Sequence, residues 1–132
     1  MKAGLVIAVL IAALVALVVR GSGQLPDAPV PVAWDRDVCG HCRMHVGDPR
    51  HAVQLITDDG AVTNFDDVGC ALRYLRERRP RVHRLWFHGE GETWIPADQV
   101  GFVAAATTPM GSGLIAVELH TPGARSLDEV QP

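Results

Sequence analysis

Soft metal donors are concentrated in one short segment of this 132-residue chain. Between Cys39 and His45, seven residues include two thiols, two imidazoles and one thioether. Thiolate and thioether sulfurs are soft donors that suit Cu(I), and a thioether stays unprotonated at any pH. Cys42 and Met44 are two positions apart, so in an extended segment both side chains point to the same side and can reach one ion.

A third sulfur donor is present at Met110, in the turn-rich sequence of residues 107–113. The chain has three methionines, and apart from the initiator they lie beside turn residues and outside the periodic apolar runs. Methionine usually fills gaps in a hydrophobic core, so ordinary packing is the alternative role for Met44 and Met110. The residues alone leave both roles open.

Thiol–disulfide exchange is an alternative function for the same segment, because Cys39-Gly40-His41-Cys42 matches the active-site tetrapeptide of protein disulfide isomerases. Such a motif normally opens a long helix whose N-terminus lowers the pKa of the thiol. Here Gly47 and Pro49 interrupt any helix within seven residues of Cys42. The local sequence therefore favours metal binding, although a disulfide between Cys39 and Cys42 could block the ligand until it is reduced.

A structural zinc site is a third alternative, but it needs four ligands and the chain has no second Cys-x-x-Cys motif. Cys70 is the remaining cysteine, and it lies on the opposite side of a predicted helix from the apolar residues of that helix. Cys70 is therefore not assigned to the metal. Nitrogen donors near the motif are His41, His45 and His51, although histidines in loops are more often solvated than ligating.

The elements that must position these residues follow the cysteine segment. Residues 52–57 and 61–65 are β-rich and are separated by an Asp-Asp-Gly turn sequence, which predicts a hairpin. Residues 67–79 are predicted to form a helix, with Asp66 and Asp67 as acceptors at its start. Further strands are predicted at residues 82–88, 101–106 and 114–119. This order, β-β-α-β followed by further strands, predicts an α+β domain with one main helix on a small, mainly antiparallel sheet.

The N-terminal residues 1–20 are predicted to be a membrane anchor or a signal segment. Residues 3–19 contain no charged or polar side chain and lie between Lys2 and Arg20. The residues that follow match a cleavage site poorly, which favours an uncleaved transmembrane helix. With Lys2 on the cytoplasmic side, the rest of the chain would face the periplasm or another extracytoplasmic space.

Three further segments complete the predicted organisation: a Pro-rich tether at residues 21–33, a copper-binding domain at 34–120 and a loose C-terminal tail at 121–132. Hydrophobic residues make up 48% of the chain, which is too apolar for a disordered protein. Beyond residue 21 the chain has ten arginines and no lysine against 15 acidic residues, a net charge of −5. This balance argues against a nucleic-acid partner.

Five motifs, in order and over about residues 37–117, resemble the NosL family of accessory copper proteins of nitrous oxide reductase maturation. They are Cys42-Arg43-Met44, Asp48-Pro49-Arg50, FDDVGC at residues 65–70, Trp94-Ile95 and TPMGSG at residues 108–113. The resemblance implies an extracytoplasmic, membrane-attached Cu(I) chaperone, not an enzyme, that delivers copper to nitrous oxide reductase. It also implies that Cys42, Met44 and Met110 are the ligands.

Three features depart from the family pattern. No cysteine for lipid attachment follows the N-terminal apolar segment, Arg43 stands where the family usually has glycine, and residues 121–132 are a poor candidate for the usual C-terminal helix. Delivery to a related copper enzyme therefore stays open. The alternative function is a membrane-anchored thiol–disulfide oxidoreductase that uses Cys39 and Cys42.

Overall fold

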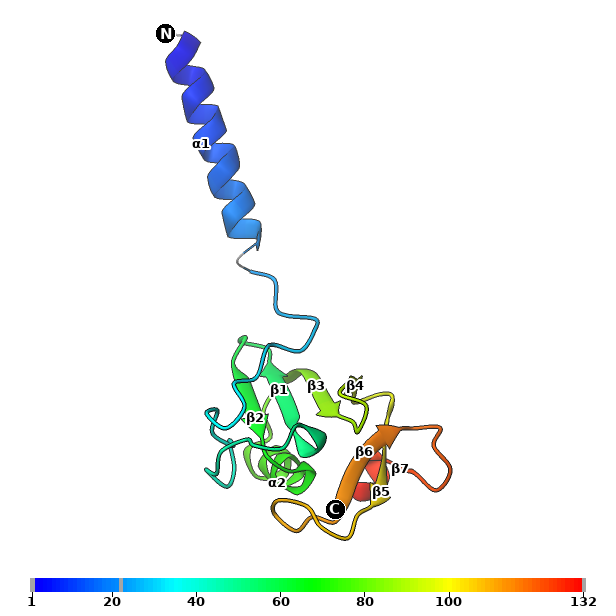
Figure 1. Ribbon diagram of the computed structural model, residues 1–132. Helices are drawn as coiled ribbons and strands as arrows, with labels where there is room; N and C mark the ends of the chain where they lie inside the picture. Colours follow the sequence, from blue (N-terminus) through cyan, green and yellow to red (C-terminus); the bar gives the residue numbers. More distant parts are fainter. Residues whose placement is uncertain (1, 22, 132) are drawn as a thin grey trace.

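A computed structural model describes residues 2–21 and 23–131, and it consists of an N-terminal helix followed by an α+β domain (Figure 1). Helix α1 (Lys2–Gly21) contains the apolar segment of the sequence. Among the described residues, no helix is both long and apolar enough to cross a bilayer. The transmembrane part of the sequence prediction is thus not supported, and the signal segment stays a prediction. Positions 1, 22 and 132 of the predicted anchor, tether and tail lie outside the described residues.

The larger of two antiparallel sheets has the strand order β2-β1-β3-β4. Its strands are β1 (Val53–Thr57), β2 (Val62–Phe65), β3 (Val82–His88) and β4 (Trp94–Pro96). The predicted hairpin is confirmed, and Gly60 closes its turn with a φ of 84°, which glycine adopts without strain. Strand β4 has only three residues and includes a proline, so it lacks the length and alternation by which a strand is predicted from sequence.

A second sheet, with the order β6-β5-β7, corrects the prediction of a single sheet. It is built from β5 (Val100–Ala104), β6 (Leu114–Glu118) and β7 (Arg125–Ser126). The chain leaves the first sheet after Pro96, where a turn closed by a hydrogen bond from Gln99 N to Pro96 O redirects it. Phe87 and Phe102 meet edge to face between the two sheets, with ring centroids 5.1 Å apart. The α+β class is confirmed, with two small sheets in place of one.

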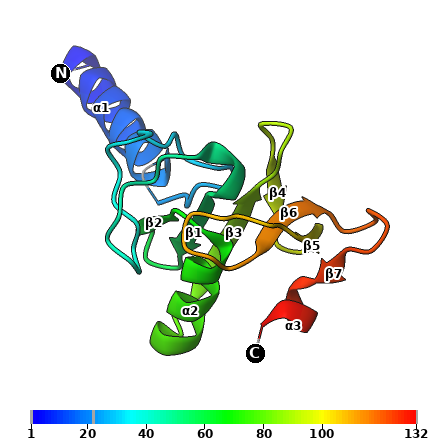
Figure 2. The same cartoon turned by 60° about the horizontal axis from the view of Figure 1, so that its bottom comes forward.

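Helix α2 (Val68–Arg78) confirms the predicted main helix and contacts both β2 and β6. Asp67 caps its start by accepting a hydrogen bond from Gly69 N, and Arg79 ends it in a left-handed conformation before Pro80. Figure 2 shows the helix beside the loop that joins β5 to β6. The first turn of α2 is therefore covered by segments from both halves of the domain.

The ends of the domain contain more contacts than the predicted tether and tail imply. Val30 exchanges two hydrogen bonds with the amide of Gln54, a fully buried side chain of β1. In the predicted tail, helix α3 (Leu127–Val130) begins with a capping box and packs Leu127 and Val130 against the core. Val30 of the predicted tether and helix α3 of the predicted tail thus contact the folded domain.

Candidate metal centre

The cysteine segment, residues 38–45, folds into a closed turn whose two ends pair as an isolated antiparallel bridge. Cys39 N donates to Met44 O at 2.8 Å, and Arg43 N donates to Cys39 O at 3.2 Å. Arg43 has a φ of 69°, in the left-handed region. The backbone between Cys42 and Met44 is therefore not extended, and the expectation that these two side chains point to the same side because of strand alternation does not apply here.

Gly40 holds the first half of this turn against strand β2. Its N–H donates to Asn64 O at 2.9 Å. A Cβ at this position would overlap Thr63 Cγ2 and press on the ring of Phe65. Only glycine lets the turn approach the strand this closely, and the approach leaves the Cys39 side chain fully buried.

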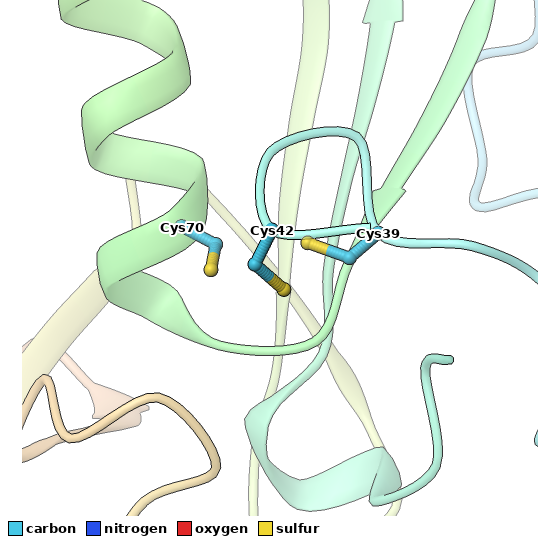
Figure 3. A group of neighbouring side chains, drawn as sticks. All are labelled: Cys39, Cys42 and Cys70. Carbon is cyan, nitrogen blue, oxygen red and sulfur yellow. The ribbon is translucent and has the colours of Figure 1, made fainter. Parts of the chain in front are cut away.

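The turn and helix α2 together bring three thiols to one point. Figure 3 shows the side chains of Cys39, Cys42 and Cys70 directed toward one another. Their Sγ atoms all lie within 4.8 Å of one another. Three sulfurs arranged around one ion in a plane, at a metal–sulfur distance of about 2.3 Å, are about 4.0 Å apart. A small contraction of the thiol cluster of Cys39, Cys42 and Cys70 therefore suffices to hold a metal ion.

Cys70 is the member of this cluster that sequence reasoning excluded. The helical-wheel argument assumed that α2 buries only one side, but Val68, Cys70, Ala71 and Leu72 are all buried in its first turns. Because the cysteine turn covers the side that the wheel assigns to solvent, Cys70 is fully buried. The signal that could have found it is the count of cysteines, since all three in the chain belong to the cluster.

Hydrogen bonds to sulfur favour one thiolate in the cluster. The Cys70 thiol and the backbone N–H groups of His41, Cys42 and Asp66 lower the pKa of Cys39 to about 4, against an opposing effect of burial. The pKa of Cys70 is raised because its thiol donates to Cys39 and is buried. Burial also raises the pKa of Cys42. These hydrogen bonds favour the thiolate at Cys39 over those at Cys42 and Cys70, and a metal ion that binds all three sulfurs releases protons.

The loop that contains Met110 is fixed to the start of α2 by Asp67. Met110 N donates to Asp67 Oδ2 at 3.0 Å, and Gly69 N donates to Asp67 Oδ1 at 2.7 Å. Burial opposes ionisation of Asp67, but hydrogen bonds from Ser112, Met110, Thr108 and Gly69 together lower its pKa. The Met110 loop and the first turn of α2, which contains Cys70, thus both bond to the buried carboxylate of Asp67.

Met44 and Met110, the two predicted thioether ligands, both remain accessible. The Met44 side chain is 58% exposed and that of Met110 is 37% exposed, whereas Cys39 and Cys70 are fully buried and Cys42 is intermediate. Packing in the core, the alternative role for these methionines, does not fit such exposure. Their part in metal binding stays a prediction.

The histidines near the motif have other partners or lie at the surface. His41 Nε2 is 3.4 Å from a carboxylate oxygen of Glu77, and His51 lies beside Asp48 at 3.8 Å. His45 is exposed. Among residues 2–21 and 23–131, no histidine or carboxylate completes the thiol cluster as a fourth ligand.

Replacement of Arg43 by glycine is expected to raise the free energy of unfolding by about 0.5 to 1 kcal/mol, because glycine adopts the left-handed conformation without a Cβ clash. Urea denaturation followed by tryptophan fluorescence measures the change. Arg73→Gly, in the interior of α2, is the matched control and should lower the free energy by about 1 kcal/mol. A loss of similar size in both variants would contradict the role of the left-handed backbone at Arg43.

In comparisons with known proteins, no protein-family model, curated protein or solved structure matches this chain. The metal chemistry of the chain is therefore argued from its own thiol cluster. Three thiols close together, with no histidine or carboxylate as a fourth donor among the described residues, define a candidate soft-metal site.

Proposed function

We propose that this protein is an extracytoplasmic Cu(I)-binding metallochaperone. The observation that carries the proposal is the thiol cluster, in which three sulfurs lie within 4.8 Å of one another. Thiolate sulfur selects soft ions, and Cu(I) and Zn²⁺ are the common candidates for such ligands. Zinc in a structural site takes four ligands in a closed tetrahedron, which the described residues do not supply. The donor set therefore suits Cu(I), which three sulfurs can satisfy.

A carrier must also release its ion, and the exposed sulfurs support this step. Cys42 is partly exposed and belongs to the same turn as Met44, so both are within reach of an acceptor protein. Met110 lies on the loop that Asp67 holds at the start of α2. We assign Cys42, Met44 and Met110 as the ligands from which an acceptor takes copper.

The resemblance to the NosL family supports nitrous oxide reductase, or a related copper enzyme, as the acceptor. Residues 1–20 would export the domain, so that loading and delivery take place outside the cytoplasm. A thioether suits that setting because it needs no deprotonation to bind a metal. Reductase partnership depends on the five motifs alone.

Thiol–disulfide exchange is supported less well by the geometry. In an oxidoreductase the attacking thiol must reach a disulfide of the substrate, but Cys39 is fully buried and Cys42 has a raised pKa. The motif also lies in a closed turn and not at the start of a helix. An insulin-reduction assay separates the two functions, because an oxidoreductase should lose its activity in Cys39→Ala.

The full chain, reduced and free of oxygen, is expected to take one equivalent of Cu(I) from a competing chelator. A tenfold excess of Zn²⁺ should not displace that copper, because the site offers soft sulfur and too few ligands for zinc. His120→Asn is the control variant and should bind copper normally. His120 follows the C-terminal end of β6, whereas the Met110 loop precedes the N-terminal end of this strand. Failure to compete with the chelator, or displacement by Zn²⁺, would refute the copper assignment.

A further inference from the structure

The sulfur donors of this protein form two sets that differ in access to solvent. Cys39 and Cys70 are fully buried thiols, whereas Met44 and Met110 are 58% and 37% exposed thioethers. Thiols become anionic on metal binding and thioethers remain neutral, so the buried pair offers the stronger electrostatic attraction for a cation. The two sets are therefore suited to different steps in the handling of one ion.

Cys42 lies between the two sets. Its Sγ is within 4.8 Å of both buried sulfurs, and its side chain is only partly covered. In Figure 3 its side chain lies between those of Cys39 and Cys70. The same residue is the proposed partner of Met44 and Met110, so one thiolate can stay bound while the other ligands of the ion change.

One member of each set, Met110 and Cys70, lies on a segment bonded to the Asp67 carboxylate. Asp67 accepts hydrogen bonds from Met110 N and from Gly69 N, and Cys70 follows Gly69 in the first turn of α2. Gly69 itself packs so closely on Ser112 that an added Cβ would lie 2.7 Å from Ser112 Cβ. The loop of the exposed Met110 and the turn of the buried Cys70 are thus fixed to each other.

We propose two copper stations that share Cys42: an inner station formed by Cys39, Cys42 and Cys70, which the thiol cluster supports, and an outer station formed by the proposed ligands Cys42, Met44 and Met110, whose thioethers are accessible. This inference rests on the proposed function and assigns Cys39 and Cys70 a role in it. The inner station stores Cu(I) away from solvent, and the outer station exchanges it with donors and acceptors.

Movement between the stations is ligand exchange at constant oxidation state. As copper moves inward, its bonds to the two thioethers break and bonds to the sulfurs of Cys39 and Cys70 form. The bond to Cys42 persists, and protons on the thiols that bind are released to solvent. The reverse sequence returns the ion to the surface, where a sulfur or nitrogen of an acceptor displaces the thioethers.

The test compares variants that remove one station and keep Cys42. Full-length Cys39→Ser and Cys70→Ser chains, loaded with one Cu(I), should release it to excess chelator about tenfold or more faster than the wild type, because only the outer station is left. Met44→Leu/Met110→Leu should keep the wild-type affinity within about threefold but load and release copper more slowly. Cys70→Ala provides a second probe of the inner station that introduces no hydroxyl, and circular dichroism checks that each variant folds.

X-ray absorption of the loaded wild type should show three thiolate sulfurs around copper, and the Cys70→Ser chain, left with the outer station, should keep the thiolate of Cys42 together with thioether sulfurs. Wild-type release rates in Cys39→Ser, Cys70→Ser and Cys70→Ala would overturn the inner station while leaving the chaperone intact. Loss of nearly all affinity in the double methionine variant would overturn it as well, because the inner station alone should hold the ion. A wild type that binds no Cu(I) would instead refute the proposed function itself.

Discussion

Cys42→Ser is expected to lower the affinity for Cu(I) by about a hundredfold to a thousandfold, the largest loss of any single substitution in the thiol cluster. Structural Zn²⁺ sites with four protein ligands bind with about 10 to 16 kcal/mol, so one ligand contributes about 2.5 to 4 kcal/mol. Cys42 belongs to the thiol cluster and is the sulfur that both proposed stations share, so the removal of its thiolate should weaken both. Chelator competition under reducing conditions measures the change.

The stability of the Cys42→Ser chain separates a ligand effect from misfolding. Because Cys42 is partly exposed and outside the fully buried core, serine at this position should leave the free energy of unfolding within about 1 kcal/mol of the wild type. An affinity within tenfold of the wild type in a folded Cys42→Ser chain would remove Cys42 from the site.

Asp67→Asn is expected to lower the free energy of unfolding by about 3 kcal/mol at pH 7, because a buried carboxylate that accepts several hydrogen bonds is replaced by an amide with fewer acceptor sites. The N–H groups of Gly69 and Met110 both donate to this carboxylate. Loss of these bonds should free the Met110 loop from α2. Urea denaturation measures the stability, and hydrogen exchange at residues 107–113 reports the release of the loop.

The pH dependence of the unfolding free energy tests the same role of Asp67. The pKa of Asp67 in the folded chain is lowered, so its contribution to stability is present above the ordinary aspartate pKa of about 4 and is lost as the pH falls through the lowered folded value. The difference in unfolding free energy between the wild type and Asp67→Asn should therefore shrink below about pH 4. A difference that is unchanged at pH 3 would contradict the role of the ionised carboxylate.

Asp66→Asn is the matched control, because the adjacent carboxyl has the opposite shift. Burial raises the pKa of Asp66, so its ionised form destabilises the fold as the pH rises through that value. An amide keeps an oxygen that can accept from Gly47 N, as Asp66 Oδ1 does. Asp66→Asn should therefore be neutral or slightly stabilising at pH 7, and a loss as large as that of Asp67→Asn would show that the effect is not specific.

Local signals in the sequence account for the elements that were predicted. The hairpin of β1 and β2 follows from alternation and an Asp-Asp-Gly turn, and α2 follows from apolar spacing between an aspartate cap and Pro80. The division into two sheets could not be predicted in this way. It depends on a turn after Pro96 and on the packing of Phe87 against Phe102, which are contacts between distant segments.

The candidate site was predictable only in part for the same reason. Cys42 follows from the Cys-x-x-Cys motif, whose spacing puts two thiols in one turn. Cys70 belongs to the cluster because the cysteine turn packs on the side of α2 that an isolated helix would expose to solvent. The periodicity of apolar residues within the helix does not predict that contact. The left-handed backbone conformation of Arg43 could not be predicted from the residue type either, because arginine rarely adopts it.

The close fit of Gly40 against β2 makes the two halves of the cysteine turn unequal. Cys39 precedes a glycine that packs closely on Thr63 and Phe65, whereas Cys42 precedes Arg43, an exposed residue in a left-handed conformation. Of the two cysteines in the turn, Cys42 should then adjust more than Cys39 to ions of different radius. Substitution at Arg43 would thus change how freely one of the three cluster thiols adjusts to a soft metal ion.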